Sequence, residues 1–288
     1  VGAIDAINAK EVLLTHDKTG ARVICLLNDD PNLGFSVCYH TEPVDNSGML
    51  HILEHAVCAS STKYPGNDVF FDSLSKAYIT DMNAWTSLSS TNYYVTSMSE
   101  DQLAVLADFY LSCAADSLLN EVPQYFSREG WRYEMATLDD PITINGIVYS
   151  EMQGYMGDLW TAAVNNTYGA LFPDTYQGYI SGGLPEDIPS LSYEQLIDFY
   201  HQCYSPSNSL TMLYGDIDVD RFLKLLDGDY FSKAEKVEVS PISKGQSAFD
   251  QPREFTYSFP VSADSTETGS TIIYMTALTD EASSNFEE

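Results

Sequence analysis

The stretch SGMLHILEHAVCAS, residues 47–60, has the apolar spacing of an amphipathic helix that begins near Gly48. On such a helix, residues i, i+3 and i+4 project from one face, so His51, Glu54 and His55 are expected to converge. The whole chain has only five histidines. Two of them lie one helical turn apart with a glutamate between them. This motif is therefore the main indication of a functional site.

Two imidazoles at this spacing suit tetrahedral Zn²⁺, which commonly takes His and carboxylate ligands and leaves one position for water. Glu54 would lie beside that water, take its proton and deliver it to a leaving amine. In a chain of this composition the pattern arises by chance roughly once in a hundred. The order H-x-x-E-H is typical of inverzincins. The alternative is an ordinary helix on which both histidines pack and Glu54 is solvated.

A zinc site of this class needs a third protein ligand from elsewhere in the chain. Glu151 is the candidate, in NGIVYSEMQGYMGD, residues 145–158. Residues 147–149 are interpreted as a strand end that passes into a helix, which presents the Glu151 carboxylate at its first turn. From the residues alone the choice stays open, because Glu151 is one of 42 acidic residues.

Composition limits the classes of partner. The 288 residues are 44% hydrophobic, enough for a sizeable core, and carry a net charge of −29. That charge disfavours nucleic acid and anionic membranes, and would attract basic peptides or metal cations, unless it only keeps the surface soluble. Five scattered cysteines without a CxxC pair are interpreted as buried thiols, typical of a reducing compartment. No apolar run is long enough to span a membrane, and no signal peptide is evident.

The predicted elements indicate an α+β fold. Residues 21–30 and 34–43 are expected to pair as antiparallel strands across the turn NDDPN. In the second strand Phe35, Val37 and Tyr39 share one face, and His40 on the other face is interpreted as structural or exposed. Ser47 or Asn46 is expected to cap the helix of the histidine motif. Further helices are predicted at 70–78, 100–119, from 151 onward and 191–206, and further strands within 80–98 and at 209–217.

This order of elements predicts a mainly antiparallel sheet with helices packed on one face. Residues 1–232 are expected to form the zinc-binding catalytic domain, and the polar residues 233–254 a linker. Residues 255–288 contain FTYSFPV and STIIYMTAL, which look like the first strands of a truncated second, similar domain.

Several blocks resemble the pitrilysin/insulinase superfamily of zinc peptidases, and specifically its presequence protease (falcilysin-like) branch. These blocks are SGMLHILEH (47–55), MNAWTS (82–87), FSREGWRYE (126–134), GIVYSEMQG (146–154) and SLSYEQLIDFYHQCYSPSNS (190–209), in the family's order. The long gap between His55 and Glu151 is also similar to this branch.

The resemblance implies roles for individual residues. It makes His51, His55 and Glu151 the ligands of one Zn²⁺ per chain, and Glu54 the general base. Asn83 and Ala84 fall where the family has an edge strand that pairs with the substrate backbone. Glu129 is a candidate hydrogen-bond partner of a histidine ligand, with a buried structural carboxylate as the alternative.

The expected function is a zinc-dependent endopeptidase that hydrolyses unfolded or short peptides. The alternatives are a catalytically silent, peptide-binding or scaffold relative, and a structural domain whose histidines never bind metal. The family resemblance implies two similar halves, so the chain is expected to be an N-terminal fragment that binds zinc but cleaves poorly without its missing C-terminal half. A bacterial cytoplasm or an organellar matrix is the expected compartment.

Overall fold

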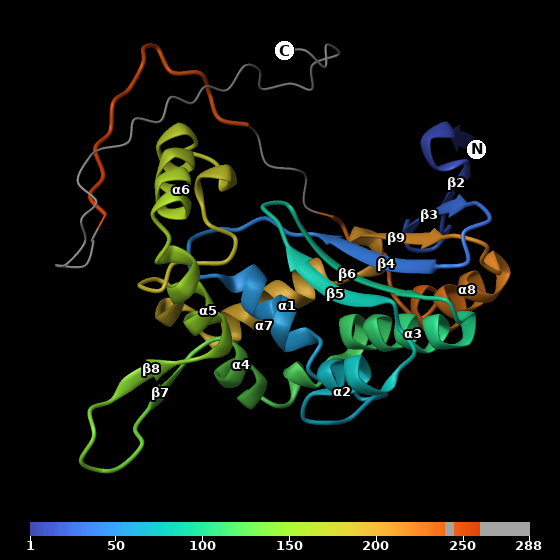
Figure 1. Cartoon of the computed structure of the whole chain (residues 1–288), viewed down its shortest axis with the longest axis horizontal. Helices are drawn as coiled ribbons and strands as arrows, with labels where there is room; N and C mark the ends of the chain where they lie inside the picture. The colour runs from blue at the N-terminus through green and yellow to red at the C-terminus, as the bar shows by residue number, and fades with distance from the viewer. Residues whose placement is uncertain (240–244, 260–288) are drawn as a thin grey trace.

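A seven-stranded, mainly antiparallel sheet is the centre of the structure, a computed structural model that describes residues 1–239 and 245–259 (Figure 1). The strand order is β1-β2-β3-β9-β4-β6-β5, and only the β3–β9 pair is parallel. The strands are β1 (Gly2–Ile4), β2 (Ala9–Thr15), β3 (Arg22–Leu27), β4 (Leu33–His40), β5 (Asp81–Thr86), β6 (Ser90–Ser97) and β9 (Ser209–Tyr214).

Helices cover one face of this sheet, with α3 against β4 and β6 and α1 against β5 (Figure 1). A separate hairpin, β7 (Arg132–Glu134) and β8 (Thr143–Asn145), projects from the body. The helices are α1 (Met49–Val57), α2 (Val69–Lys76), α3 (Glu100–Asp116), α4 (Gln124–Glu129), α5 (Ile147–Met156), α6 (Leu159–Leu171), α7 (Tyr193–Cys203) and α8 (Val219–Leu225). Shorter helical turns are η1 (Asp5–Ile7), η2 (Leu118–Asn120), η3 (Tyr176–Gly178), η4 (Ile188–Ser190), η5 (Pro206–Asn208) and the π-helix η6 (Leu226–Phe231).

The predicted α+β class is confirmed, and the alternation along β4 explains the layering. Phe35, Val37 and Tyr39 are buried against the helices, as their shared face predicts. His40, on the opposite face, is partly buried and its Nε2 lies 3.1 Å from Glu42 Oε1.

The predicted direct pairing of the strands around NDDPN is wrong. β3 and β4 both pair with β9, which lies between them and comes from about 170 residues later in the chain. Because neighbouring strands lie about 4.8 Å apart, the five-residue turn has to span roughly 10 Å, which it can do easily. The neighbouring prediction, strands β5 and β6 joined by a Ser-rich turn, is confirmed.

The predicted side-chain cap of α1 is also wrong. Gly48 occupies the N-cap in the left-handed region, at φ 70°, and no side chain caps the helix. Asn46 is engaged elsewhere, because its Oδ1 accepts a hydrogen bond from Ile180 N and its carbonyl accepts one from Leu184 N. The glycine is needed because the backbone of Gly182 passes close to it, and an added Cβ would lie 2.7 Å from the Gly182 carbonyl oxygen.

Two further expectations concern the C-terminal part. Residues 255–259 form no strand, and the remainder of the expected second-domain strands lies outside the described residues. The division into a domain at 1–232, a linker at 233–254 and a second domain therefore stays a prediction. Within the described part of the chain, helices long and apolar enough to cross a bilayer are absent.

Replacing Gly48 by Ala should lower the free energy of unfolding by about 2 kcal/mol, because the left-handed backbone strains an L side chain and its Cβ meets the Gly182 carbonyl. Chemical denaturation measures the difference. Gly154→Ala in α5 is the control, since a Cβ there meets nothing within 4 Å and should keep or raise stability. Equal stability of Gly48→Ala and the unchanged chain would contradict this account of the helix start.

Candidate metal centre

The three proposed ligand residues come together between α1 and α5. Glu151 Oε2 lies 3.7 Å from His51 Nε2 and 3.9 Å from His55 Nε2, and ligand atoms of all three residues lie within 4.8 Å of one another. Tetrahedral Zn²⁺ with bonds of about 2.1 Å separates its ligand atoms by roughly 3.4 Å. The three side chains therefore fit a zinc ion with only small adjustments.

Helix α1 presents its polar face because the rest of its surface is buried. Seven of its nine residues are buried, and the apolar ones pack into the core beneath the sheet. The two imidazole rings lie edge to face, with centroids 4.9 Å apart. His51, Glu54 and His55 are thus one face of a helix whose orientation is set by apolar packing.

Glu151 is placed by α5, and here the local prediction is wrong. Residues 147–149 are the first turn of α5, not a strand end, so Glu151 lies in the second turn. The start of the helix is held by a close approach between Gly146 and Gly130, because a Cβ on Gly146 would lie 2.0 Å from the Gly130 carbonyl oxygen. This contact joins α5 to the end of α4, where Glu129 lies.

Glu129 lies beside His55, a position open to both expected roles, a partner of a histidine ligand and a buried structural carboxylate. Its Oε2 is 3.3 Å from His55 Nδ1, its Oε1 accepts a 2.6 Å hydrogen bond from Arg128 Nε, and it is 5% exposed. Burial would raise the pKa of Glu129, but the hydrogen bonds from His55 and Arg128 lower it overall. The contact at Nδ1 leaves His55 Nε2 directed at the ligand cluster.

The two histidines differ in their electrostatic environment. Burial, followed by the charge of His55, lowers the pKa of His51 to about 4, against a smaller opposing effect of the Gly182 backbone. Burial also acts to lower the pKa of His55, but the hydrogen bond with Glu129 and the charges of Glu54, Glu129 and Glu151 raise it overall. His51 is therefore neutral at pH 7, the form that binds a metal ion.

Glu54 is 8% exposed and has a partner that the sequence did not reveal. Thr86, the last residue of β5, donates a 2.5 Å hydrogen bond from Oγ1 to Glu54 Oε2. Burial raises the pKa of Glu54, although Thr86 and His55 act in the opposite direction. Thr86 follows Asn83 and Ala84 in MNAWTS, but only the packing of α1 against β5 shows which carboxylate its hydroxyl meets.

Asn83 and Ala84 lie on β5, which is the edge strand of the described sheet. Asn83 is exposed, its Oδ1 accepts a 2.9 Å hydrogen bond from Ala84 N, and its carbonyl accepts one from Tyr110. The two residues thus border the site through β5 without joining the metal cluster.

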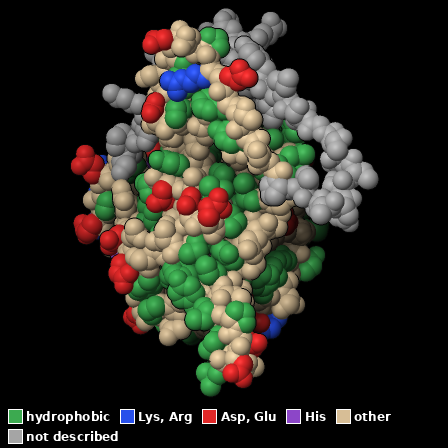
Figure 2. All heavy atoms as spheres, turned by 90° about the vertical axis from the view of Figure 1, so that its left-hand side faces the viewer, with side chains coloured by type: hydrophobic (Ala, Val, Ile, Leu, Met, Phe, Trp, Pro, Cys, Tyr) green, Lys and Arg blue, Asp and Glu red, His purple; other side chains and the backbone are tan. Residues whose placement is uncertain are grey.

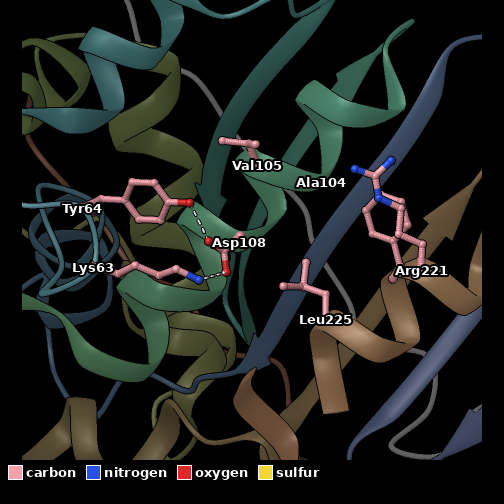
Figure 3. A pocket seen from close by; sticks show the side chains of 8 residues that line it. Lys63, Tyr64, Ala104, Val105, Asp108, Arg221 and Leu225 are labelled. Atoms are coloured by element: carbon pink, nitrogen blue, oxygen red, sulfur yellow. Dashed lines mark hydrogen bonds and ion pairs between the residues drawn. The ribbon is translucent and has the colours of Figure 1, made fainter. Parts of the chain in front are cut away.

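A cavity of about 250 Å³ lies away from this cluster, against α3 and α8 (Figure 3). Its buried carboxylate, Asp108, accepts hydrogen bonds from Lys63, Tyr64 and Tyr230 at 2.7, 2.5 and 2.6 Å. Burial raises the pKa of Asp108, but these hydrogen bonds lower it overall. Arg221, on the cavity wall, pairs with Glu100 and Asp101. The charged groups that line the cavity are already paired with neighbouring side chains, so the α1–α5 cluster is the candidate functional site.

Two family models match the chain. Residues 35–141 match Insulinase (Peptidase family M16), and residues 190–283 match Peptidase M16 inactive domain. The chain belongs to the insulinase family of peptidases. The mouse mitochondrial presequence protease is 36% identical over 247 residues, which are 85% of this chain and 24% of that protein. Protein HypA of Clostridium perfringens (strain 13 / Type A) is 33% identical over 251 residues, 86% of this chain and 26% of that protein.

Solved structures show the same fold at lower identity. A mutant of the ferredoxin protease FusC in complex with Arabidopsis ferredoxin has a TM-score of 0.67 at 17% identity, over 84% of this chain and 26% of that one. A protease from Helicobacter pylori has a TM-score of 0.62 at 16% identity, over 82% of this chain and 53% of that one. The insulinase-family chain described here spans about a quarter of the length of the curated relatives it matches.

The low pKa of His51 predicts acid sensitivity of the metal-free chain. The unfolded chain protonates His51 near 6.5 and the folded chain near 4, so the folded state loses stability as pH falls through this window. Between pH 7 and 5 this residue should account for about 2 kcal/mol of the loss. Urea unfolding with a chelator present measures it.

The matched variants are His51→Gln, which should remove this part of the pH dependence, and His201→Gln on the exposed side of α7, which should keep it. If His51→Gln and the unchanged chain lose equal stability between pH 7 and 5, the burial account of His51 is incorrect.

Proposed function

We propose that the chain is the metal-binding domain of a zinc-dependent endopeptidase, of the inverzincin type, that hydrolyses unfolded or short peptides. The observation that carries this proposal is the cluster of His51, His55 and Glu151 with Glu54 on the same helix face. The presequence proteases among its relatives support peptide hydrolysis as the reaction.

The proposed roles follow from position and environment. His51, His55 and Glu151 would hold one Zn²⁺, which when bound lowers the pKa of a water molecule and polarises a carbonyl. Glu54 is the proposed general base, because it shares the helix face with both histidines and its raised pKa suits a group that accepts a proton and passes it on. Glu129 would hold the ring of His55 in orientation.

The open edge of β5 is the proposed binding site for the substrate backbone. The Ser87 N–H donates a hydrogen bond to the Ser90 carbonyl. Because backbone hydrogen bonds alternate along an antiparallel pair, the N–H and C=O groups of the odd-numbered residues of β5 point toward β6. The backbone groups of Ala84 and Thr86 then face the free edge. Asn83 Oδ1 occupies the Ala84 N–H, in the place that a substrate carbonyl would take.

The surface beside the site indicates the kind of peptide. Figure 2 shows the face that carries α5, α6 and the β7–β8 hairpin, where acidic side chains gather near the centre between apolar areas and Lys and Arg are sparse. Tyr155, one turn beyond Glu151 on α5, is 54% exposed, and Trp160 on α6 is 62% exposed. With the net charge of −29, this surface favours peptides that carry both basic and apolar side chains.

Parts of the enzyme beyond this chain enter the proposal, since the curated relatives are about four times as long. Groups that stabilise the tetrahedral oxyanion are assigned to the remaining polypeptide. The related presequence proteases are mitochondrial or chloroplastic proteins, which supports an organellar matrix as the compartment, with a bacterial cytoplasm as the alternative.

Elemental analysis should find one zinc per purified chain after reconstitution at neutral pH. His51→Ala and Glu151→Gln should weaken binding by more than the roughly 10–100-fold that loss of an outer hydrogen-bond partner costs. His201→Ala and Glu121→Gln, at exposed positions, are the matched controls and should keep the metal. A chain that takes up no zinc would instead be a structural domain, and the endopeptidase proposal would fall.

Glu54→Gln should leave zinc content unchanged and lower kcat for an unfolded fluorogenic peptide by about 10²–10⁴-fold, the usual contribution of a general base. The assay uses the zinc-loaded polypeptide that carries this chain together with its C-terminal remainder, and Glu121→Gln should keep full activity. A zinc-loaded but inactive unchanged enzyme would favour the alternative, a peptide-binding relative without catalysis.

A further inference from the structure

Thr86 connects the open edge of the sheet with the carboxylate of Glu54. Its side chain belongs to the even-numbered set of β5 that faces the helices, like Met82, which is 4% exposed. Trp85, of the opposite set, is 53% exposed and contacts Tyr94 on the other face. Backbone direction and side-chain face both alternate along a strand. The backbone groups of Thr86 therefore point to the free edge of the sheet, while its hydroxyl points to α1.

The hydrogen bond itself is short and well supported. Thr86 Oγ1 lies 2.5 Å from Glu54 Oε2, within the range for a hydroxyl that donates to a carboxylate. The turn that follows Thr86 is held by hydrogen bonds from Ser87 N to the Ser90 carbonyl and between the two Ser hydroxyls. The position of Thr86 is thus determined by the β5–β6 hairpin and not by Glu54.

Glu54 is tied to the same hairpin at a second point. The hydroxyl of Tyr93, which is 1% exposed on β6, lies 3.5 Å from the Glu54 carbonyl oxygen and 2.7 Å from the Tyr204 hydroxyl. Thr86 engages Oε2 of the carboxylate, so the proposed role of Glu54 as base falls to Oε1. Both the main chain and the carboxylate of Glu54 are therefore held by contacts with the β5–β6 hairpin.

We propose that Thr86 is a positioning residue that links the substrate strand on β5 to the general base, by holding the Glu54 carboxylate in its productive rotamer when a peptide pairs with the edge. The inference rests on the proposed function, since it takes Glu54 as the base and β5 as the substrate edge. It adds a residue whose backbone borders the substrate and whose side chain orients the carboxylate of the general base.

The test compares Thr86→Val, which keeps the shape and removes the hydroxyl, with Thr86→Ser, which keeps the hydroxyl. In the zinc-loaded polypeptide that carries the chain with its remainder, Thr86→Val should lower kcat by about 10–100-fold with KM changed by less than about threefold. Thr86→Ser should keep kcat within about threefold. Zinc content should be the same in both variants.

Two further variants separate positioning from a general loss of structure. Thr96→Val removes a threonine–threonine hydrogen bond with Thr80, away from Glu54 on β6, and should keep kcat. Adding Thr86→Val to Glu54→Gln should cause no further loss, because the hydroxyl then has no base to position.

The inference is overturned if Thr86→Val keeps its kcat, if Thr86→Ser loses as much as Thr86→Val, or if Thr86→Val raises KM alone or loses zinc. Failure of the proposed function looks different: Glu54→Gln would then turn over peptide normally, or the unchanged enzyme would bind no zinc or cleave no peptide.

Discussion

A short helix that is buried around most of its circumference and carries three ionisable side chains on one face is the constraint on which the rest of this structure depends. The apolar residues of α1 fix its position beneath the sheet, so His51, Glu54 and His55 stay on a largely buried face. Buried polar groups are costly unless they are paired. Three elements supply partners for this face: α4 brings Glu129, β5 brings Thr86 and α5 brings Glu151.

The charges of these partners explain why the cluster suits a divalent cation. Glu54, Glu129 and Glu151 surround two imidazoles, and Arg128, the cation paired with this group, bonds to Glu129. The same excess of negative charge raises the pKa of His55, whereas burial lowers that of His51. An ion of charge +2 would compensate the negative charge of the carboxylates. It would also bind both imidazoles in their neutral form, which is the form that coordinates a metal.

The sequence predicted those parts of the site that follow local rules. Helical spacing was enough to place His51, Glu54 and His55 on one face, and composition and periodicity were enough for the α+β class. Glu151 and Glu129 needed the family resemblance, because no local pattern distinguishes them from the other acids.

The remaining features depend on contacts between distant segments. Strand β9 inserts between β3 and β4 although the turn between them is short, and the Gly182 backbone passes close to Gly48 at the start of α1. In the sequence Thr86 has the features of an ordinary strand residue, and only the packing of α1 against β5 places its hydroxyl beside Glu54. Strand pairing and helix packing of this kind leave no periodic signal in the segments involved, so local sequence patterns do not predict them.

The same non-local assembly would make binding of the proposed metal and folding interdependent. His51 and Glu151 are 100 residues apart in the chain, and α1 and α5 are otherwise joined through α4 and the Gly130–Gly146 contact. An ion held by both helices closes that long loop, and closing it in the unfolded chain is entropically unfavourable. The free energy of binding such an ion would therefore also stabilise the fold of this part of the domain. Glu54 lies on α1 between the two histidines, so an ion held by them would also fix the position of the proposed base. On its other side, Glu54 is held by the hydrogen bond from Thr86 on β5.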